Sequence, residues 1–157
     1  MRDDKWLEFE LDYLLKTYFS NVALINPIEI KFGREAKFRF GSIRLVSDHR
    51  VRGNKRVKGL RSIIRVGDKP KKSIIIITSM FAAENIPVDV VRYTIAHELC
   101  HYAHGFSSTN KRLFKHPHHG GIVNKELKVR GAAELIGAFK KWLKEYRAKI
   151  LAGRMRI

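Results

Sequence analysis

The segment YTIAHELCHYAHG, residues 93–105, constrains this chain most, because it sets His97 and His101 four residues apart within a helical pattern. Apolar residues recur at helical spacing between Pro87, which suits the first turn of a helix, and Gly105, which suits its end. On such a helix the two imidazoles lie on one face, about 6 Å apart along the axis. The residues expected on the opposite, core-facing side are Val91, Ile95, Leu99 and Tyr102.

The spacing of these two histidines is typical of a metal site. Two imidazoles one helical turn apart can grip a single ion, and Glu98 lies beside them within reach of a bound water. This is the HExxH pattern, whose chemistry is zinc-dependent hydrolysis. We therefore expect a zinc ion held by His97 and His101, with Glu98 as the catalytic base.

A catalytic zinc site needs a third protein ligand and keeps its fourth position for water. The segment HPHHGGIVNKEL, residues 116–127, follows a loop that can fold back toward the helix. We favour His119, immediately before a glycine, as the third ligand, and His118 is the next candidate. Glu126 and Glu134, on the helices expected downstream, are the remaining alternatives.

Two further residues near the motif are expected to play other parts. A continuous helix places His104 about 4.5 Å further along the axis than His101, too far for the same ion. We expect His104 to line the cleft instead. Cys100, the only cysteine, is expected to be a small buried residue, and a single cysteine excludes a disulfide within the chain.

The remaining pattern indicates an α+β fold in one domain, residues 1–157: an N-terminal helix, a small and mostly antiparallel sheet, the HExxH helix and C-terminal helices. The expected helices outside 87–105 are 3–20, a short one at 121–130 and a last one at 131–151. The expected strands are IEIKFG, AKFRFGSIRLV, SIIRV and the buried SIIIITSM, residues 28–33, 36–46, 62–66 and 73–80.

Charge is concentrated in two parts of the chain. The net charge is +17, and residues 49–72 hold ten Lys or Arg against one acidic residue. Residues 111–157 hold thirteen against three. Self-repulsion of this size favours a polyanionic partner. No apolar run is long enough to span a membrane, and we expect a cytoplasmic, nucleoid-associated protein.

A nucleic acid is therefore the expected partner, and single-stranded or damaged DNA is the form that we favour. Basic side chains can follow phosphates while exposed aromatic rings, here Phe106 and Phe114, stack on unpaired bases. The residues expected to contact nucleic acid are Arg52, Lys55, Arg56 and Lys58 in one block and Lys111, Arg112, Phe114 and Lys115 in the other.

His97-Glu98-Leu99-Cys100-His101, followed by the His119-Gly120 pair and preceded by a small sheet, resembles the SprT-like (Spartan-like) zinc metalloprotease family. The likeness covers roughly residues 60–130. It implies a zincin-like fold, with zinc bound by His97, His101 and His119 and Glu98 as the general base. It also implies an endopeptidase stimulated by DNA, which degrades proteins bound or crosslinked to DNA. SIIIITSM would offer a sheet edge to an extended substrate.

Two other interpretations remain open. The segments HELCHYAHG and AAELIGAF are also similar to ImmA/IrrE-like proteases that cut repressors, which would make Glu134 the third ligand. A nucleic-acid-binding module with a structural zinc is the other alternative, and it would fill the fourth position with His116 or His118.

Overall fold

The structure is a computed structural model that describes residues 1–47 and 70–154, and within them it confirms an α+β fold. The α-helices are α1 (Asp4–Thr17), α2 (Val88–Ala103), α3 (Ile122–Val129) and α4 (Ala133–Arg154); the strands are β1 (Ile28–Phe32), β2 (Gly41–Ser47) and β3 (Lys71–Ile77); short 3-10 turns are η2 (Ser79–Ala82) and η3 (His119–Gly121). None of the described helices is long and apolar enough to cross a membrane.

The three strands form a mixed sheet in the order β1-β3-β2. β3 pairs in parallel with β1 and antiparallel with β2, so the expectation of a mostly antiparallel sheet is wrong. The apolar run of β3 is buried, as predicted, because the strand lies between two others. This central position corrects the expectation that SIIIITSM is a free edge. The expected strand SIIRV lies outside the described residues.

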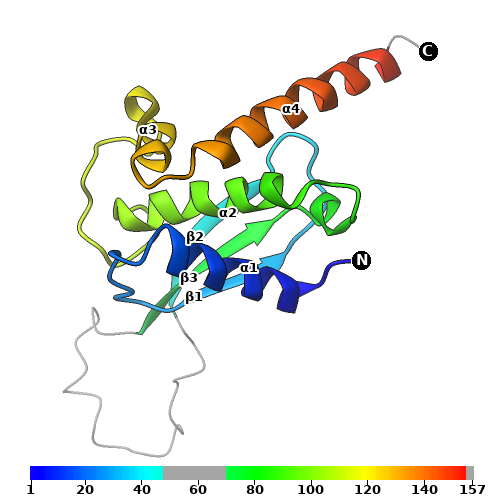
Figure 1. The fold of residues 1–157 in the computed structure, drawn as a ribbon. Helices are drawn as coiled ribbons and strands as arrows, with labels where there is room; N and C mark the ends of the chain where they lie inside the picture. The colour runs from blue at the N-terminus through cyan, green and yellow to red at the C-terminus, as the bar shows by residue number, and fades with distance from the viewer. Residues whose placement is uncertain (48–69, 155–157) are drawn as a thin grey trace, which may run out of the picture.

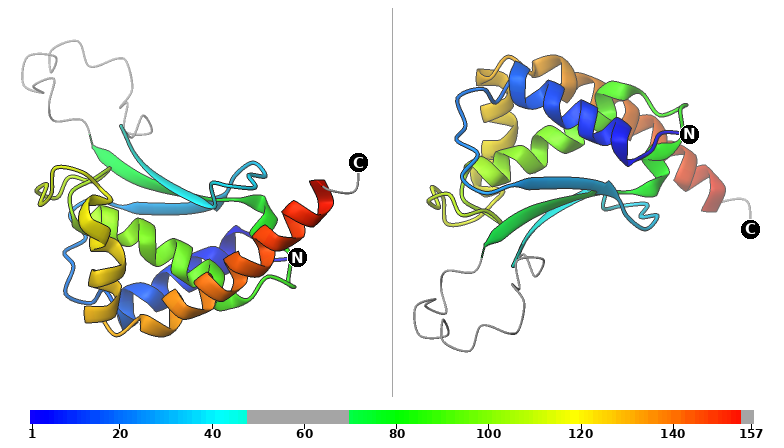
Figure 2. Two further views of the ribbon diagram at one scale, coloured as in Figure 1. Left: turned by 90° about the horizontal axis from the view of Figure 1, so that it is seen from above. Right: turned by 90° about the horizontal axis from the view of Figure 1, so that it is seen from below.

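The described helices all lie on the same side of the sheet (Figure 2). α1 packs against β1, and α2 packs against β2 and β3. α3 and α4 contact α2 away from the strands, so α2 runs through the middle of the molecule (Figure 1). Apolar side chains from α1, the sheet and α2 to α4 share one buried core. Because α2 is held from several sides, it is a rigid support for side chains on its remaining face.

Strand β2 begins five residues later than the alternating pattern AKFRF predicts. Thr78, just after β3, bonds this segment through its side chain: its Oγ1 accepts from the N–H of Ala36 at 2.9 Å and donates to the Ala36 carbonyl at 3.1 Å. Phe40 turns toward the helices, where its ring packs against Phe81 and Trp142 at 5.4 Å. These contacts hold residues 36–40 outside the ladder, and the strand starts at Gly41.

Candidate metal centre

Helix α2 carries the two histidines of the motif on the face opposite its apolar stripe, as predicted. The stripe of Val91, Ile95, Leu99 and Tyr102 is buried in the core. His97 is partly buried and His101 is only 5% exposed, and their rings lie 4.7 Å apart. The helix therefore presents both imidazoles side by side at the edge of the core.

A third imidazole, from His118, completes this group. The Nε2 atom of His118 lies 3.0 Å from Nε2 of His97 and 3.1 Å from Nε2 of His101. The ligand atoms of the three residues lie within 4.8 Å of one another, close enough to hold one metal ion. Nitrogen ligands around a tetrahedral zinc ion would lie about 3.3 Å apart, given Zn–N bonds of about 2.05 Å. The three histidines fit a bound metal ion.

The third member is His118, whereas the sequence analysis favoured His119. His118 follows Pro117, which lines the same hollow as the histidine pair. His119 begins η3 and is exposed. Gly120 and Gly121 both have positive φ, 60° and 68°, and this reverses the chain directly after the histidines. Both histidines are exposed, and the path of the loop brings only the ring nitrogen of His118 to the histidine pair.

The other candidate ligands lie elsewhere. Glu134 is exposed in the first turn of α4, and His116 is exposed in the loop. Neither joins the group of three, nor does Glu126, which contacts His104. Among the described residues the group therefore offers three ligand atoms, and a tetrahedral metal ion held by them would keep a fourth position for water or substrate.

The histidines are held in the form that binds metal. Burial, together with the neighbouring His118, lowers the pKa of His97 to about 4. Burial and then the other three histidines nearby lower the pKa of His101 to about 3. Both rings are therefore neutral at pH 7, and only a neutral imidazole has a lone pair to give to a metal.

Glu98 lies beside this group and is nearly buried, with 6% of its surface exposed. Burial raises the pKa of its carboxyl group to about 7, and the positive charge of Arg39 partly opposes the increase. A carboxyl group with a pKa near the working pH can both take up and release a proton. Its position one residue after His97 and its pKa both suit an acid–base role.

The site opens into two adjoining hollows that share Arg39, Gly41, His97 and Glu98. The first, of about 410 Å³, contains the three histidines and is bordered by the start of β2 and the loop after α2. The second, of about 260 Å³, has a mainly aromatic wall; its aromatic residues are Phe38, Phe40, Tyr93 and Phe139. Glu98 therefore lies where a polar and an aromatic hollow meet.

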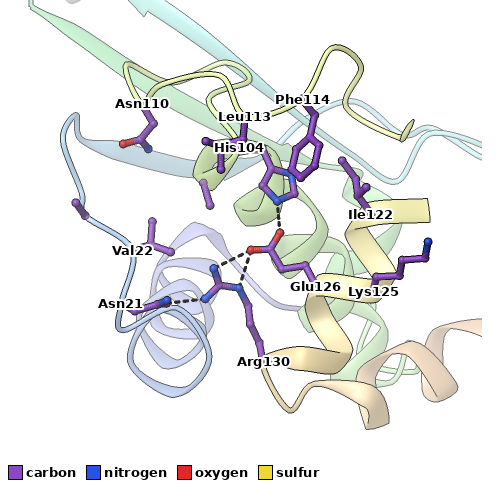
Figure 3. Close-up of a pocket in the computed structure, with 12 residues that line it drawn as sticks. Asn21, Val22, His104, Asn110, Leu113, Phe114, Ile122, Lys125, Glu126 and Arg130 are labelled. Atoms are coloured by element: carbon purple, nitrogen blue, oxygen red, sulfur yellow. Dashed lines mark hydrogen bonds and ion pairs between the residues drawn. The ribbon is translucent and has the colours of Figure 1, made fainter. Parts of the chain in front are cut away.

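His104 does not line this cleft, which corrects the sequence-based expectation. It is 4% exposed, and its Nε2 contacts a carboxylate oxygen of Glu126 on α3 (Figure 3). It borders a separate hollow of about 550 Å³, the largest of the three, on the other side of the loop. His104 follows Ala103, the last residue of α2, and its contact with Glu126 directs its ring toward α3.

Glu126 continues this contact into a network (Figure 3). Its Oε1 accepts from Nε and Nη2 of Arg130 at 3.0 and 2.8 Å. Nη1 of Arg130 donates to the carbonyl of Tyr18 and to Oδ1 of Asn21, at 2.9 and 2.7 Å. The network ties the end of α2 to α3 and to the segment after α1, on both sides of the loop that carries His118.

The predicted nucleic-acid contacts divide into two groups. Arg52, Lys55, Arg56 and Lys58 lie outside the described residues. Lys111, Arg112 and Lys115 are exposed on the loop between α2 and α3. Of the two loop phenylalanines, Phe106 is buried at 7% exposure and cannot stack on a base, whereas Phe114 is 36% exposed and its ring lies 4.8 Å from that of His104.

Two residues at the site were not singled out from the sequence. Arg39 and Gly41 come from the segment before β2 and from its first residue, more than 50 positions before the motif. An alternating strand pattern gives no sign that its beginning meets the active helix. The glycine inside FRFGSIRL is the one signal that was present, since a glycine within a strand pattern often marks a close approach of the backbone.

Comparison of the chain with models of known protein families, with curated proteins and with solved structures found no match.

Proposed function

We propose that this chain is a zinc-dependent endopeptidase. The observation that carries the proposal is the convergence of three imidazoles beside a buried carboxyl group in an open hollow. Three histidine ligands with an open position are typical of catalytic zinc, whereas structural zinc is enclosed by four protein ligands. His97, His101 and His118 are the proposed ligands.

Zinc, when bound, would polarise the scissile carbonyl and lower the pKa of its water toward neutrality. Glu98 takes the proton from that water and later delivers it to the leaving amine. Because Glu98 is nearly buried, little solvent competes for its carboxylate, and this strengthens its interactions with the water and with the leaving amine. The hydroxyl of Tyr93 donates to Oδ1 of Asn124 at 2.8 Å, so it is not free to donate to the carbonyl oxygen of a substrate. Arg39 and Arg112 are the cations that border the cleft.

We propose β2 as the strand that holds the substrate. It pairs with β3 on one side, and among the described residues no strand pairs with its other side. Gly41, Ser42 and Ile43 of this strand line the hollow that contains the histidines. An extended peptide that added to this edge would place its backbone across Glu98. Such binding uses main-chain hydrogen bonds and accepts many sequences.

The decisive experiment is the substitution Glu98→Gln, with Glu145→Gln as a matched control on the exposed face of α4. Glu98→Gln should retain the metal and the fold, and hydrolysis of an unfolded protein should fall by about 10²- to 10⁴-fold. Glu145→Gln should behave as the unchanged protein. Metal content is measured by atomic emission and cleavage by gel electrophoresis. Full activity in Glu98→Gln would refute the proposed mechanism.

We further propose that the substrates are proteins held on DNA. The support is the net charge of +17 and the exposed lysines of the loop that also carries His118. Tethering on one strand raises the effective concentration of a neighbouring substrate, to the order of millimolar for short connections. An enzyme with an open cleft would then cut mainly proteins bound beside it.

A further inference from the structure

The hollow that contains the histidines is bordered by two arginines, Arg39 and Arg112. Both are exposed, and no ion pair within the described part of the chain involves either of them. Glu98 is the only acidic residue among those lining this hollow, and it is nearly buried. The cleft therefore presents two exposed cationic groups against a single, nearly buried carboxyl group, so at least one of the two lacks a counter-charge.

The two arginines come from different parts of the chain. Arg39 precedes β2 and also borders the aromatic hollow, so it lies where the two hollows meet. Arg112 belongs to the loop after α2, and its guanidinium lies over the ring of Phe106, 4.8 Å from the centroid. This stacking limits the positions that the Arg112 side chain can adopt and keeps its donors at the rim.

We infer that the cleft selects peptides carrying a glutamate or aspartate within a few residues of the scissile bond, bound by Arg39 or Arg112. The inference rests on the proposed peptidase activity and specifies its substrate class. A guanidinium offers paired N–H donors that match the two oxygens of a carboxylate. A substrate acid would supply the counter-charge that the cleft lacks, and a substrate lysine at the same place would be repelled.

A carboxylate side chain suits this site better than a nucleic acid phosphate. A hollow of about 410 Å³ has room for a few side chains of an extended peptide. The arginines also share this hollow with Glu98, the proposed base, so a group bound by them lies near the bond to be cut. The exposed lysines Lys111 and Lys115 are not among the residues that line the hollow, and they remain available to a phosphate backbone outside it.

The test uses quenched fluorescent peptides in the zinc-loaded protein. One neutral sequence is prepared with Glu, Gln or Lys at each of the three positions on either side of the cut. We expect one or two positions at which Glu gives a kcat/KM about five- to tenfold above Gln, with Lys below Gln. The preference should shrink as salt is raised from about 0.05 M to 0.5 M, because exposed charges are screened.

Substitutions then identify the residues that carry the preference. In Arg39→Ala or Arg112→Ala the Glu-to-Gln ratio at the selected position should fall to about one, and Arg39→Glu or Arg112→Glu should favour the Lys peptide. Arg147→Ala is the matched control, since Arg147 is an exposed arginine of α4 that does not line the hollow, and its replacement removes the same charge. It should keep the ratio of the unchanged protein.

A binding measurement separates this inference from the proposed function. Zinc-loaded Glu98→Gln should bind the Glu peptide more tightly than the Gln peptide in fluorescence anisotropy. Absence of cleavage of every peptide and protein would refute the peptidase, whereas cleavage without a Glu preference would refute the acidic specificity alone. Equal losses on Glu and Gln peptides in Arg39→Ala would assign that arginine to the reaction and overturn its role in selection. Loss of DNA affinity with an unchanged ratio would assign the arginines to nucleic acid.

Discussion

Gly41, the first residue of β2, lies directly against Glu98 of α2. A Cβ atom at position 41 would come within 2.7 Å of Cγ2 of Thr94 and 3.2 Å of Oε1 of Glu98. Only a glycine allows the strand to approach the active helix so closely. The position of the proposed base is therefore set from the sheet side as well as by its own helix.

Gly41→Ala should lower activity strongly while the metal is retained. The added methyl group has to displace Thr94 or Glu98, and a small misplacement of a catalytic group costs about 10²-fold in rate. Gly137→Ala is the matched control, because a Cβ there meets nothing within 4 Å and the helix gains up to about 1 kcal/mol. The readouts are kcat, zinc content and Tm. An active Gly41→Ala would show that Glu98 has room to move.

Metal binding should depend on His118 and not on His119. His97→Ala, His101→Ala and His118→Ala each remove one of three ligands, and zinc content under mild chelator competition should fall below about a tenth of one ion per chain. His119→Ala changes an exposed residue outside the group and should keep its zinc. The reverse pattern for the two neighbouring histidines would reinstate His119 as the third ligand.

The metal-free protein should become more stable when Glu98 is replaced by Gln, and the gain should grow as pH rises from about 4.5 to about 7. The folded state holds the carboxyl pKa at about 7, against 4.5 for the ordinary side chain. Below pH 4.5 the group is protonated in both states and contributes no difference. Above pH 7 the folded state must keep a buried charge, so the gain from Gln should approach about 3 kcal/mol.

This pH dependence is measured by urea unfolding in chelator at pH 5 and pH 8. His97 and His101 act in the opposite sense, since their lowered pKa values make the fold less stable as pH falls below 6.5. They are present in both proteins, so the difference between the two isolates Glu98. An equal gain at both pH values would mean that the charge of Glu98 is not the cause.

Glu126→Ala should destabilise the protein by about 2–3 kcal/mol, because it leaves the buried His104 and much of the Arg130 side chain without their partner. Glu145→Ala, at an exposed position of α4, should change the free energy of unfolding by less than about 0.5 kcal/mol. Chemical denaturation of the two variants provides the comparison. Equal stability would show that the network of Figure 3 contributes nothing.

Single-stranded DNA should stimulate proteolysis, and its affinity should fall steeply as salt is raised. Lysines and arginines release counterions when they neutralise phosphates. Replacing Arg52, Lys55, Arg56 and Lys58 together should flatten the plot of log affinity against log salt, and replacing Lys111 and Lys115 tests the second block. Cleavage of a DNA-binding protein is compared with and without DNA. Equal rates in an active enzyme would refute the dependence on DNA.

Local sequence signals predicted helix α2 and two of the three histidines that lie close enough to hold a metal ion. The periodicity around His97 and His101 reports on a single helix, whose geometry depends little on the rest of the chain. The buried strand at Ile74–Ile77 was also predicted from a local signal, because a short continuous apolar run is typical of a strand that is buried on both faces.

The features that the sequence did not predict depend on contacts between distant segments. The partner of His104 lies on α3, and the neighbour of Glu98 is the first residue of β2. The choice between His118 and His119 depends on the path of the loop between α2 and α3. Residue spacing alone does not specify this path, because the two histidines are neighbours in the same loop.

Cys100 lies between the two helical ligands in sequence, yet its side chain is fully buried in the core on another face of α2. Burial raises the pKa of its thiol well above the ordinary value, so no thiolate is present to react with peroxide or to capture a soft cation. The group that could hold a metal ion consequently offers nitrogen atoms and no sulfur. Oxidants that inactivate thiol-dependent hydrolases should leave this centre intact. Cadmium and copper(I), which prefer sulfur ligands, should find none here.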